Sequence, residues 1–185
     1  EPVHAAPAAV PPERPPPARP SRPAPAPVLT AHIVRLEPWP KAVQVTHNGK
    51  LLGAYGTDVR TVQLSSGRNE FLFENPACYT ERVLLPAGIT PEEVRVRLRW
   101  KPALLQVKAW AEDGSGSREP LHADLLVDGR LIGRSGQVVA LPIVGDDSSR
   151  NTTVQISASG RRTVTRSLTV HANQLSQLEV PLPSE

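Results

Sequence analysis

Short runs of apolar and alternating residues cover most of the chain after residue 27, and they have the length of β-strands. In 94–99, for example, three valine or leucine residues alternate with three arginines. A period of two places successive side chains on opposite faces of a strand. Glycine, proline, asparagine, aspartate and serine interrupt the runs, and helix signals are nearly absent. The pattern predicts strands at 32–36, 42–46, 51–55, 59–64, 69–73, 79–85, 94–98, 103–110, 123–127, 130–133, 137–141, 151–157, 163–170 and 178–182.

Two of these strand pairs meet at a two-residue turn, Asn48-Gly49 in one place and Asp128-Gly129 in the other. Both dipeptides favour a type I′ hairpin turn, which needs φ > 0 at both central residues. The two hairpins align with an offset of 80 residues, and further matches are Lys50 with Arg130, Leu51 with Leu131, Gly53 with Gly133, and Gly56 with Gly136. The predicted strands after the hairpins also pair off, at separations of 77–85 residues. The chain is therefore predicted to be a tandem repeat of a small β unit.

The fold class predicted from these patterns is all-β, with two tandem small β-sandwich units behind a disordered segment. Residues 1–27 carry 11 of the 21 prolines and alternate them with alanine, so they cannot bury a core. We expect them to form a spacer with polyproline II character. An Arg-x-x-Pro-x-x-Pro pattern at 14–20 leaves open a role as a ligand for aromatic-lined grooves. The first sandwich is expected at 28–102 and the second at 103–185.

The residues of the two units resemble the PEGA domain family. The closest match is 126–133, where an apolar strand enters Asp-Gly and leaves through Arg-Leu-Ile-Gly, and 48–53 is a second. The family's Val-x-Val-x-Leu ending is matched by 94–98 and 178–182. The Thr-Pro that commonly follows the second glycine is missing, and the family's Gly-Tyr pair is degraded at 76–79 and at 160–161. The resemblance covers about 38–183 as two divergent copies, and it implies a non-catalytic β module of bacterial envelope proteins or of membrane-linked Ser/Thr kinases.

Composition removes several classes of function. The net charge of +3 is too small to indicate nucleic-acid binding. The single cysteine, Cys78, rules out a disulfide within the chain, and we expect it to be a buried apolar residue. The five histidines lack the spacing of a metal site, and His47 is expected to be an isolated turn histidine. No nucleophile motif or phosphate loop is present. We therefore expect no enzyme activity, no metal and no cofactor.

One row of like charges is the candidate binding site. Arg95, Arg97 and Arg99 fall on one face of a strand, and Lys101 continues the row. Guanidinium groups spaced along a strand could hold an anionic polysaccharide or an acidic protein. The alternative is that they pair with acidic residues on neighbouring strands, such as Glu81. Nucleic acid is not expected, because the row lacks interleaved aromatic residues on which bases could stack.

The sequence thus predicts a non-catalytic module of a larger bacterial envelope or signalling protein that binds a protein or an anionic envelope partner. A purely structural spacer without a ligand is the alternative, and an extracytoplasmic sensor region of a Ser/Thr kinase is another. The expected location is the cell envelope or periplasm, with the cytoplasm as the alternative. Any membrane attachment would come from segments outside this chain. The sequence does not identify the ligand.

Overall fold

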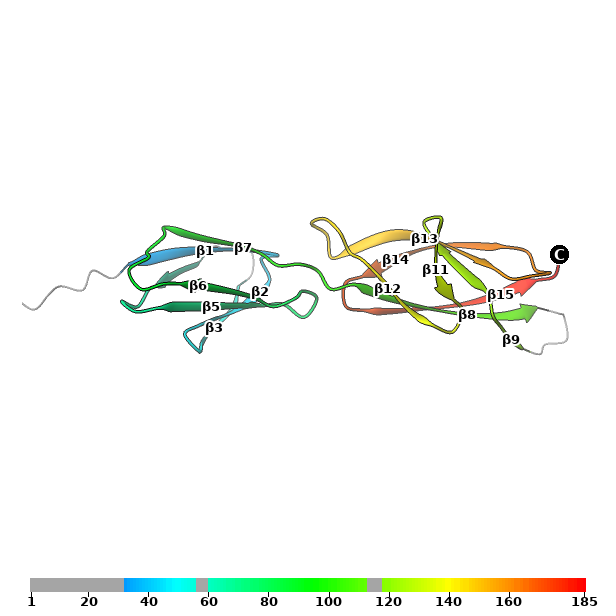
Figure 1. Cartoon of the computed structure of the whole chain (residues 1–185), viewed down its shortest axis with the longest axis horizontal. Coiled ribbons are helices and arrows are strands. Elements are labelled where there is room, and N and C mark those ends of the chain that lie inside the picture. The colour runs from blue at the N-terminus through cyan, green and yellow to red at the C-terminus, as the bar shows by residue number, and fades with distance from the viewer. Residues whose placement is uncertain (1–31, 56–59, 113–117) are drawn as a thin grey trace, which may run out of the picture. The chain divides into compact units, whose positions relative to one another are not determined.

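A computed structural model of the chain describes residues 32–55, 60–112 and 118–185. The proline-rich segment 1–27, for which a spacer is predicted, lies outside these residues. The described residues are strands, turns and loops, without a helix, and they belong to an all-β sandwich fold. The strands form four sheets, two from each half of the described chain (Figure 1).

The first half contains seven strands in two sheets. A three-stranded sheet has the order β4-β1-β7, and a four-stranded sheet has the order β3-β2-β5-β6. The strands are β1 (Ile33–Trp39), β2 (Val43–His47), β3 (Lys50–Tyr55), β4 (Arg60–Gln63), β5 (Asn69–Glu74), β6 (Glu81–Leu85) and β7 (Glu93–Arg97).

The second half repeats this arrangement with one added strand. One sheet has the order β12-β8-β15, with β9 also paired to β8, and the other has the order β11-β10-β13-β14. The strands are β8 (Ala103–Glu112), β9 (Pro120–Leu121), β10 (Asp124–Val127), β11 (Arg130–Arg134), β12 (Val138–Leu141), β13 (Ser149–Ser157), β14 (Val164–His171) and β15 (Leu175–Pro183).

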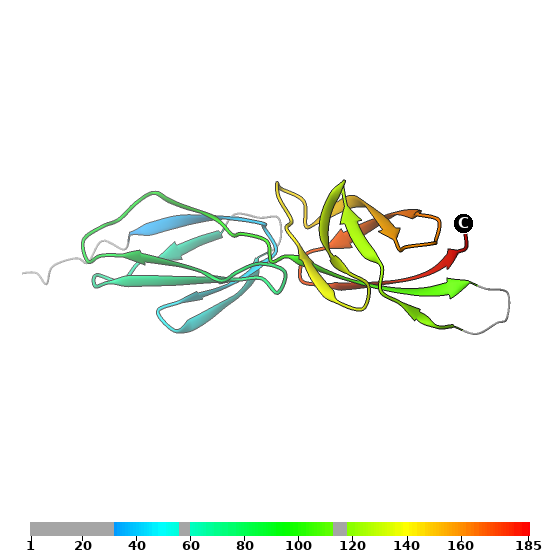
Figure 2. The ribbon, with the colours of Figure 1, turned by 45° about the vertical axis from the view of Figure 1, so that its right-hand side comes forward.

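The two halves share their strand pairing in detail. In each, the first and last strands are parallel neighbours, β1 with β7 and β8 with β15, and the other pairs are antiparallel. Figures 1 and 2 both show β8 and β15 side by side. Each first hairpin also has an irregularity after the same position, Val45 in one half and Leu125 in the other. These two residues are 80 apart, which is the offset that the sequence repeat predicts.

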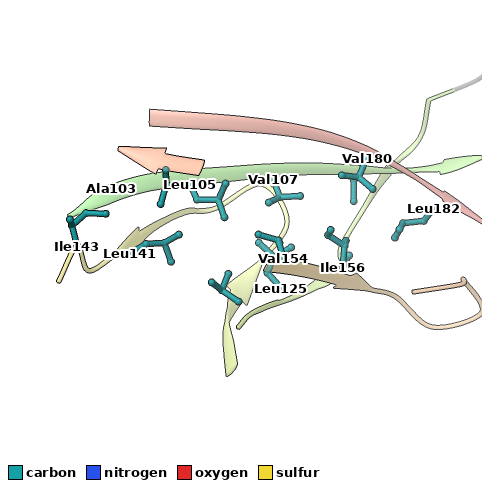
Figure 3. Packing of buried hydrophobic residues seen from close by; sticks show 14 of the residues in the cluster. Ala103, Leu105, Val107, Leu125, Leu141, Ile143, Val154, Ile156, Val180 and Leu182 are labelled. Atoms are coloured by element: carbon teal, nitrogen blue, oxygen red, sulfur yellow. The ribbon is translucent and has the colours of Figure 1, made fainter. Parts of the chain in front are cut away.

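A separate hydrophobic core lies between the two sheets of each half. Along β8 every second residue is buried, from Ala103 through Leu105 and Val107 onward. These side chains face Leu125, Val154 and Ile156 of the opposite sheet (Figure 3). The other core holds Leu36, Phe71 and Phe73, all fully buried, together with Cys78. Cys78 is 1% exposed, as expected of a small apolar residue, and burial raises the pKa of its thiol.

Two features differ from the sequence prediction. The first strand was expected to stop before Pro38-Trp39-Pro40, but β1 continues to Trp39. It can do so because β4 pairs only with 33–36, so beyond Leu36 the strand has one neighbour, β7, and a missing proline N–H is tolerated there. The second difference is β9, a two-residue strand that the alternation did not reveal.

Candidate functional site

The two hairpin turns have the same backbone conformation. Asn48 and Gly49 have φ of 47° and 78°, and Asp128 and Gly129 have φ of 48° and 79°. Positive φ at both central residues is the property of a type I′ turn, whose twist matches that of the strands it joins. Asparagine and aspartate tolerate this conformation better than other residues with a Cβ, which explains their place before the glycine.

In each half the side chain of the first turn residue also binds the neighbouring strand. The Asn48 side-chain oxygen accepts the backbone N–H of Glu70 at 2.8 Å. The Asp128 carboxylate accepts the backbone N–H of Thr153 at 2.9 Å and the hydroxyl of Thr152 at 3.0 Å, and it pairs with Arg150. The Thr153 N–H, the Thr152 hydroxyl and the Arg150 charge together hold the pKa of Asp128 below its usual value. The turn residues are therefore structural, and they tie each hairpin to the third strand of its sheet.

Because the pKa of Asp128 is lowered, the stability of the second half should depend on pH, and Asp128→Asn should remove this dependence. A carboxyl whose pKa is depressed on folding stabilises the fold above its unfolded pKa of about 3.9, and this contribution is lost as the pH falls through the folded pKa. We expect the difference in free energy of unfolding between wild type and Asp128→Asn to be constant above about pH 5. It should shrink as the pH falls toward the folded pKa. Urea unfolding from pH 3 to pH 7 measures it, and a difference that does not change with pH would contradict the assignment.

The structure gives Arg95 acidic partners on its own sheet. Arg95 contacts Glu37 at 3.3 Å and Glu93 at 2.8 Å, and Arg35 contacts the same two carboxylates at 3.2 and 3.1 Å. The hydrogen bond and charge of Glu93, together with the charge of Glu37, raise the pKa of Arg95. The parallel register of β1 and β7 places these four side chains in one cross-strand network.

The other three residues of the predicted row meet different groups. Arg97 pairs with Asp146, the guanidinium of Arg99 lies 5.7 Å from the centre of the Tyr79 ring, and Lys101 Nζ donates to the carbonyl of Pro76 at 3.0 Å. Glu81, given as an example of an acidic neighbour, belongs to β6 in the opposite sheet, so that example was wrong. The alternative of pairing with acidic residues holds for Arg95 and Arg97. Each member of the row therefore has an intrachain contact, but only Arg95 and Arg97 have carboxylate partners among the described residues.

Arg97 and Arg99 line a hollow of about 420 Å³. Tyr79, Trp100 and Val144 also face it. Tyr79 is 48% exposed and Val144 is 82% exposed, so the hollow offers both apolar and cationic surface to solvent. Arg95 and Lys101 do not line it, which divides the predicted row into two parts.

A buried polar cluster in the first half was not foreseen from the sequence. The Asn69 side chain is 1% exposed and accepts hydrogen bonds from His47 at 2.9 Å and from the N–H and hydroxyl of Ser65. Its amide donates to the carbonyls of Ser65 and Gly67, both at 3.0 Å. His47, expected to be an isolated turn histidine, stacks on Phe71 with ring centres 4.5 Å apart. The cluster closes the turn before β5, and no short motif signals it.

Two kinds of feature are absent from the described residues. These residues include no group of three histidine, cysteine, aspartate or glutamate side chains that could hold a metal ion. In the same part of the chain, no helix is long and apolar enough to cross a membrane. Every buried side-chain nitrogen or oxygen described has a hydrogen-bond partner.

Comparison with known proteins gives distant likenesses only. The sequence matches no protein-family model, and no curated protein matches it significantly. Among solved structures, the Bacillus anthracis TIE protein is 10% identical with a TM-score of 0.44; the match covers 83% of this chain and 34% of that one. The minor pilin GBS52 of Streptococcus agalactiae is 10% identical with a TM-score of 0.36, over 84% of this chain and 97% of that one.

A third likeness is to the shaft pilin SpaA of Lactobacillus rhamnosus GG, which is 11% identical with a TM-score of 0.26, over 84% of this chain and 98% of that one. The chain thus spans about a third of the length of the TIE protein. At these TM-scores the likenesses carry no argument about function.

Proposed function

We propose that this chain is a non-catalytic spacer of a larger cell-envelope protein, in which two divergent copies of a PEGA-like β-sandwich hold neighbouring parts at a fixed separation. The observation that carries the proposal is the junction between the two halves. Trp100 packs against both hydrophobic cores, so the linking residues are part of the folded structure. A spacer of this kind needs stiffness at the junction more than it needs a ligand.

Hydrogen bonds from both sides hold the junction. Trp100 pairs with Cys78 in an isolated β-bridge, and its indole N–H donates to the carbonyl of Gly145 at 3.3 Å. The Asn173 side chain donates to the carbonyl of Pro76 at 3.0 Å, and its backbone N–H donates to Pro102 at 3.1 Å. The linking residues include Pro102 and no glycine, which limits rotation between the halves.

Replacement of Trp100 tests the spacer function. Trp100→Ala removes a contact shared by both cores, and we expect it to destabilise the chain by about 2 kcal/mol, less than for a fully buried tryptophan. It should also uncouple the halves, so that one calorimetric transition becomes two. Trp39→Ala is the matched control, because Trp39 is 39% exposed and lies on β1, and its single transition should persist. Two transitions in the wild type, or a single one in Trp100→Ala, would contradict the proposal.

Binding of an anionic envelope polysaccharide is a second candidate function. The observation that favours it is Arg99, whose guanidinium contacts the Tyr79 ring and has no carboxylate partner among the described residues. It gives the hollow one planar donor that matches carboxylate geometry, beside Arg97, which already pairs with Asp146. An acidic protein would need a longer run of free cations, and Arg95 is already neutralised by Glu37 and Glu93.

Immobilised polygalacturonate tests this second candidate. Joint replacement of Arg95, Arg97 and Arg99 by glutamine should abolish binding and leave the melting temperature nearly unchanged, since exposed ion pairs contribute little to stability. Wild-type binding should weaken as salt rises, because exposed charges are screened beyond about 8 Å at physiological ionic strength. In the control variant, Arg130, Arg162 and Arg166 are replaced by glutamine, which changes the net charge by the same amount. Equal loss in both variants, or no wild-type binding, would leave the spacer as the only function.

A further inference from the structure

The second half contains a pocket of about 320 Å³ on its outer surface, away from the junction residues. Its walls come from the end of β8, from β9 and the residues beside it, from the turn before β12, and from β15. Trp110, Pro120 and Leu121 supply the apolar part of the lining. Lys108, Arg118, His122 and Glu179 surround it. A volume near 300 Å³ is at the small end of the range for ligand pockets.

Comparison of the two halves shows that this pocket is an addition to a shared frame. Trp39 pairs with Arg97 on the last strand of the first half, and Trp110 pairs with Pro181 on the last strand of the second. Three residues before each tryptophan, Leu36 pairs with Val94 and Val107 pairs with Leu178. Val94 and Leu178 are the first residues of the matching segments 94–98 and 178–182, so the two tryptophans occupy equivalent positions. In the first half only residues 40–42 separate the tryptophan from β2, whereas residues 111–123 separate Trp110 from the equivalent strand, β10.

The longer connection carries β9, the strand without a counterpart in the described first half. Pro120 and Leu121 form β9 and line the pocket, as do Arg118 and His122 beside it. These four residues of the longer connection therefore form one wall beside a tryptophan that both copies possess. Since the first half folds with a much shorter connection, the addition is not required to complete the sandwich.

Ser135 and Gly136, which also line the pocket, already have hydrogen-bond partners within the chain, so a ligand would meet no unpaired buried polar group there. The Ser135 hydroxyl donates to the carbonyl of Leu121 at 2.5 Å and accepts the N–H of Ala123 at 2.9 Å. The Gly136 N–H donates to the carbonyl of Val107 at 2.7 Å. A ligand here would gain its binding energy from the apolar lining and from the charged rim.

The rim favours an anion. Lys108 and Arg118 are cationic and exposed, and Glu179 is the single carboxylate in the lining. The Arg118 guanidinium lies 5.0 Å from the centre of the Trp110 ring, which holds a cation over the aromatic face. A flat ring packed on the apolar lining would place a carboxylate substituent within reach of Lys108 and Arg118.

We propose that this pocket binds a small aromatic carboxylate, with Trp110 as the apolar contact and Arg118 and Lys108 as the partners of the carboxylate. The proposal goes beyond the spacer function and does not depend on it. The volume suits one or two fused rings, and it is too small for an extended peptide or an oligosaccharide.

Binding of 2-naphthoate to the whole chain tests the proposal, with 2-naphthylmethanol as the neutral match. Two-dimensional NMR of the tryptophan indole N–H signals reports binding at Trp110 apart from the other two tryptophans. The dissociation constant of the carboxylate should be on the order of 1 mM or below, from the binding energy per heavy atom of small ligands. The neutral alcohol should bind at least about tenfold more weakly, because it cannot pair with the cations.

Variants separate the pocket from non-specific binding. Trp110→Ala, followed through the backbone amide signals of Leu121 and His122, should lose binding of 2-naphthoate, and Trp39→Ala, at the equivalent position of the first half, should retain it. Arg118→Gln combined with Lys108→Gln replaces exposed side chains without disturbing the core, and it should abolish the preference for the carboxylate over the alcohol. No shift of the Trp110 signal at 10 mM naphthoate, equal binding by Trp110→Ala, or equal affinity for the two probes would each overturn the proposal. A tighter response to tri-galacturonate than to naphthoate would overturn the ligand class.

Discussion

Gly129→Val is expected to lower the free energy of unfolding of the second half by about 2 kcal/mol or more. Gly129 has φ of +79°, a left-handed conformation that costs a residue with a Cβ about 1–2 kcal/mol, and more when the residue is β-branched. A Cβ at this position would have no atom within 4 Å, so the loss arises from the backbone and not from a steric clash. Misalignment of the hairpin would also weaken the contacts of Asp128 with β13. Urea unfolding monitored by circular dichroism measures the loss.

The chain offers matched controls for this substitution. Gly67→Ala places a Cβ in open space at a glycine without positive φ, so it should change stability little. Gly129→Asn should cost less than Gly129→Val, because asparagine tolerates the left-handed region. Gly49→Val, in the other copy of the turn, should reproduce the loss in the first half, since Gly49 has φ of +78°. A Gly129→Val chain as stable as wild type would show that the turn lacks this conformation in solution.

Asn69→Ala is expected to destabilise the first half by about 2–4 kcal/mol. The substitution removes a buried amide that makes five hydrogen bonds to His47, Ser65 and Gly67, and it leaves a cavity at the position of Asn69. The turn before β5 should loosen, and the stacking of His47 on Phe71 should lose its orientation. Amide hydrogen exchange at 65–71 locates the effect, and urea unfolding gives its size.

The equivalent position in the second half is the control. Thr152 is also buried, and within the described part of the chain its hydroxyl makes hydrogen bonds only to the Asp128 carboxylate. Thr152→Val keeps the shape of the side chain and should cost about 1 kcal/mol, within the range for one hydrogen bond. A loss from Asn69→Ala no larger than that from Thr152→Val would contradict the account of the cluster.

The sequence predicts the features that depend on neighbouring residues. Asn-Gly and Asp-Gly select one turn type through local backbone sterics, so the hairpins and their 80-residue offset can be read directly. Alternation likewise predicts the two faces of β7, because Val94 and Val96 are buried while Arg95 and Arg97 are exposed. The duplication then extends each prediction from one half to the other.

Features that join distant residues were missed. Arg35 meets Glu93 across a separation of 58 residues, and only the parallel pairing of β1 with β7 brings them together. Glu81 was therefore the wrong partner for the arginine row. The Asn69 cluster depends on the position of His47 in the adjacent strand, and β9 is too short to show a period. Local pattern identifies strands joined by a tight turn as neighbours, but it contains no information on which distant strands pair.

The proposed spacer function requires that the junction around Trp100 join the two β-sandwiches into one stiff body. Backbone ¹⁵N relaxation of residues 32–185 tests it most directly, because the ratio of longitudinal to transverse rates reports the tumbling of each half separately. The account predicts one shared tumbling behaviour for the strands of both halves in the wild type, and separate, faster tumbling of each half in Trp100→Ala. Independent tumbling of the two halves in the wild type would contradict it.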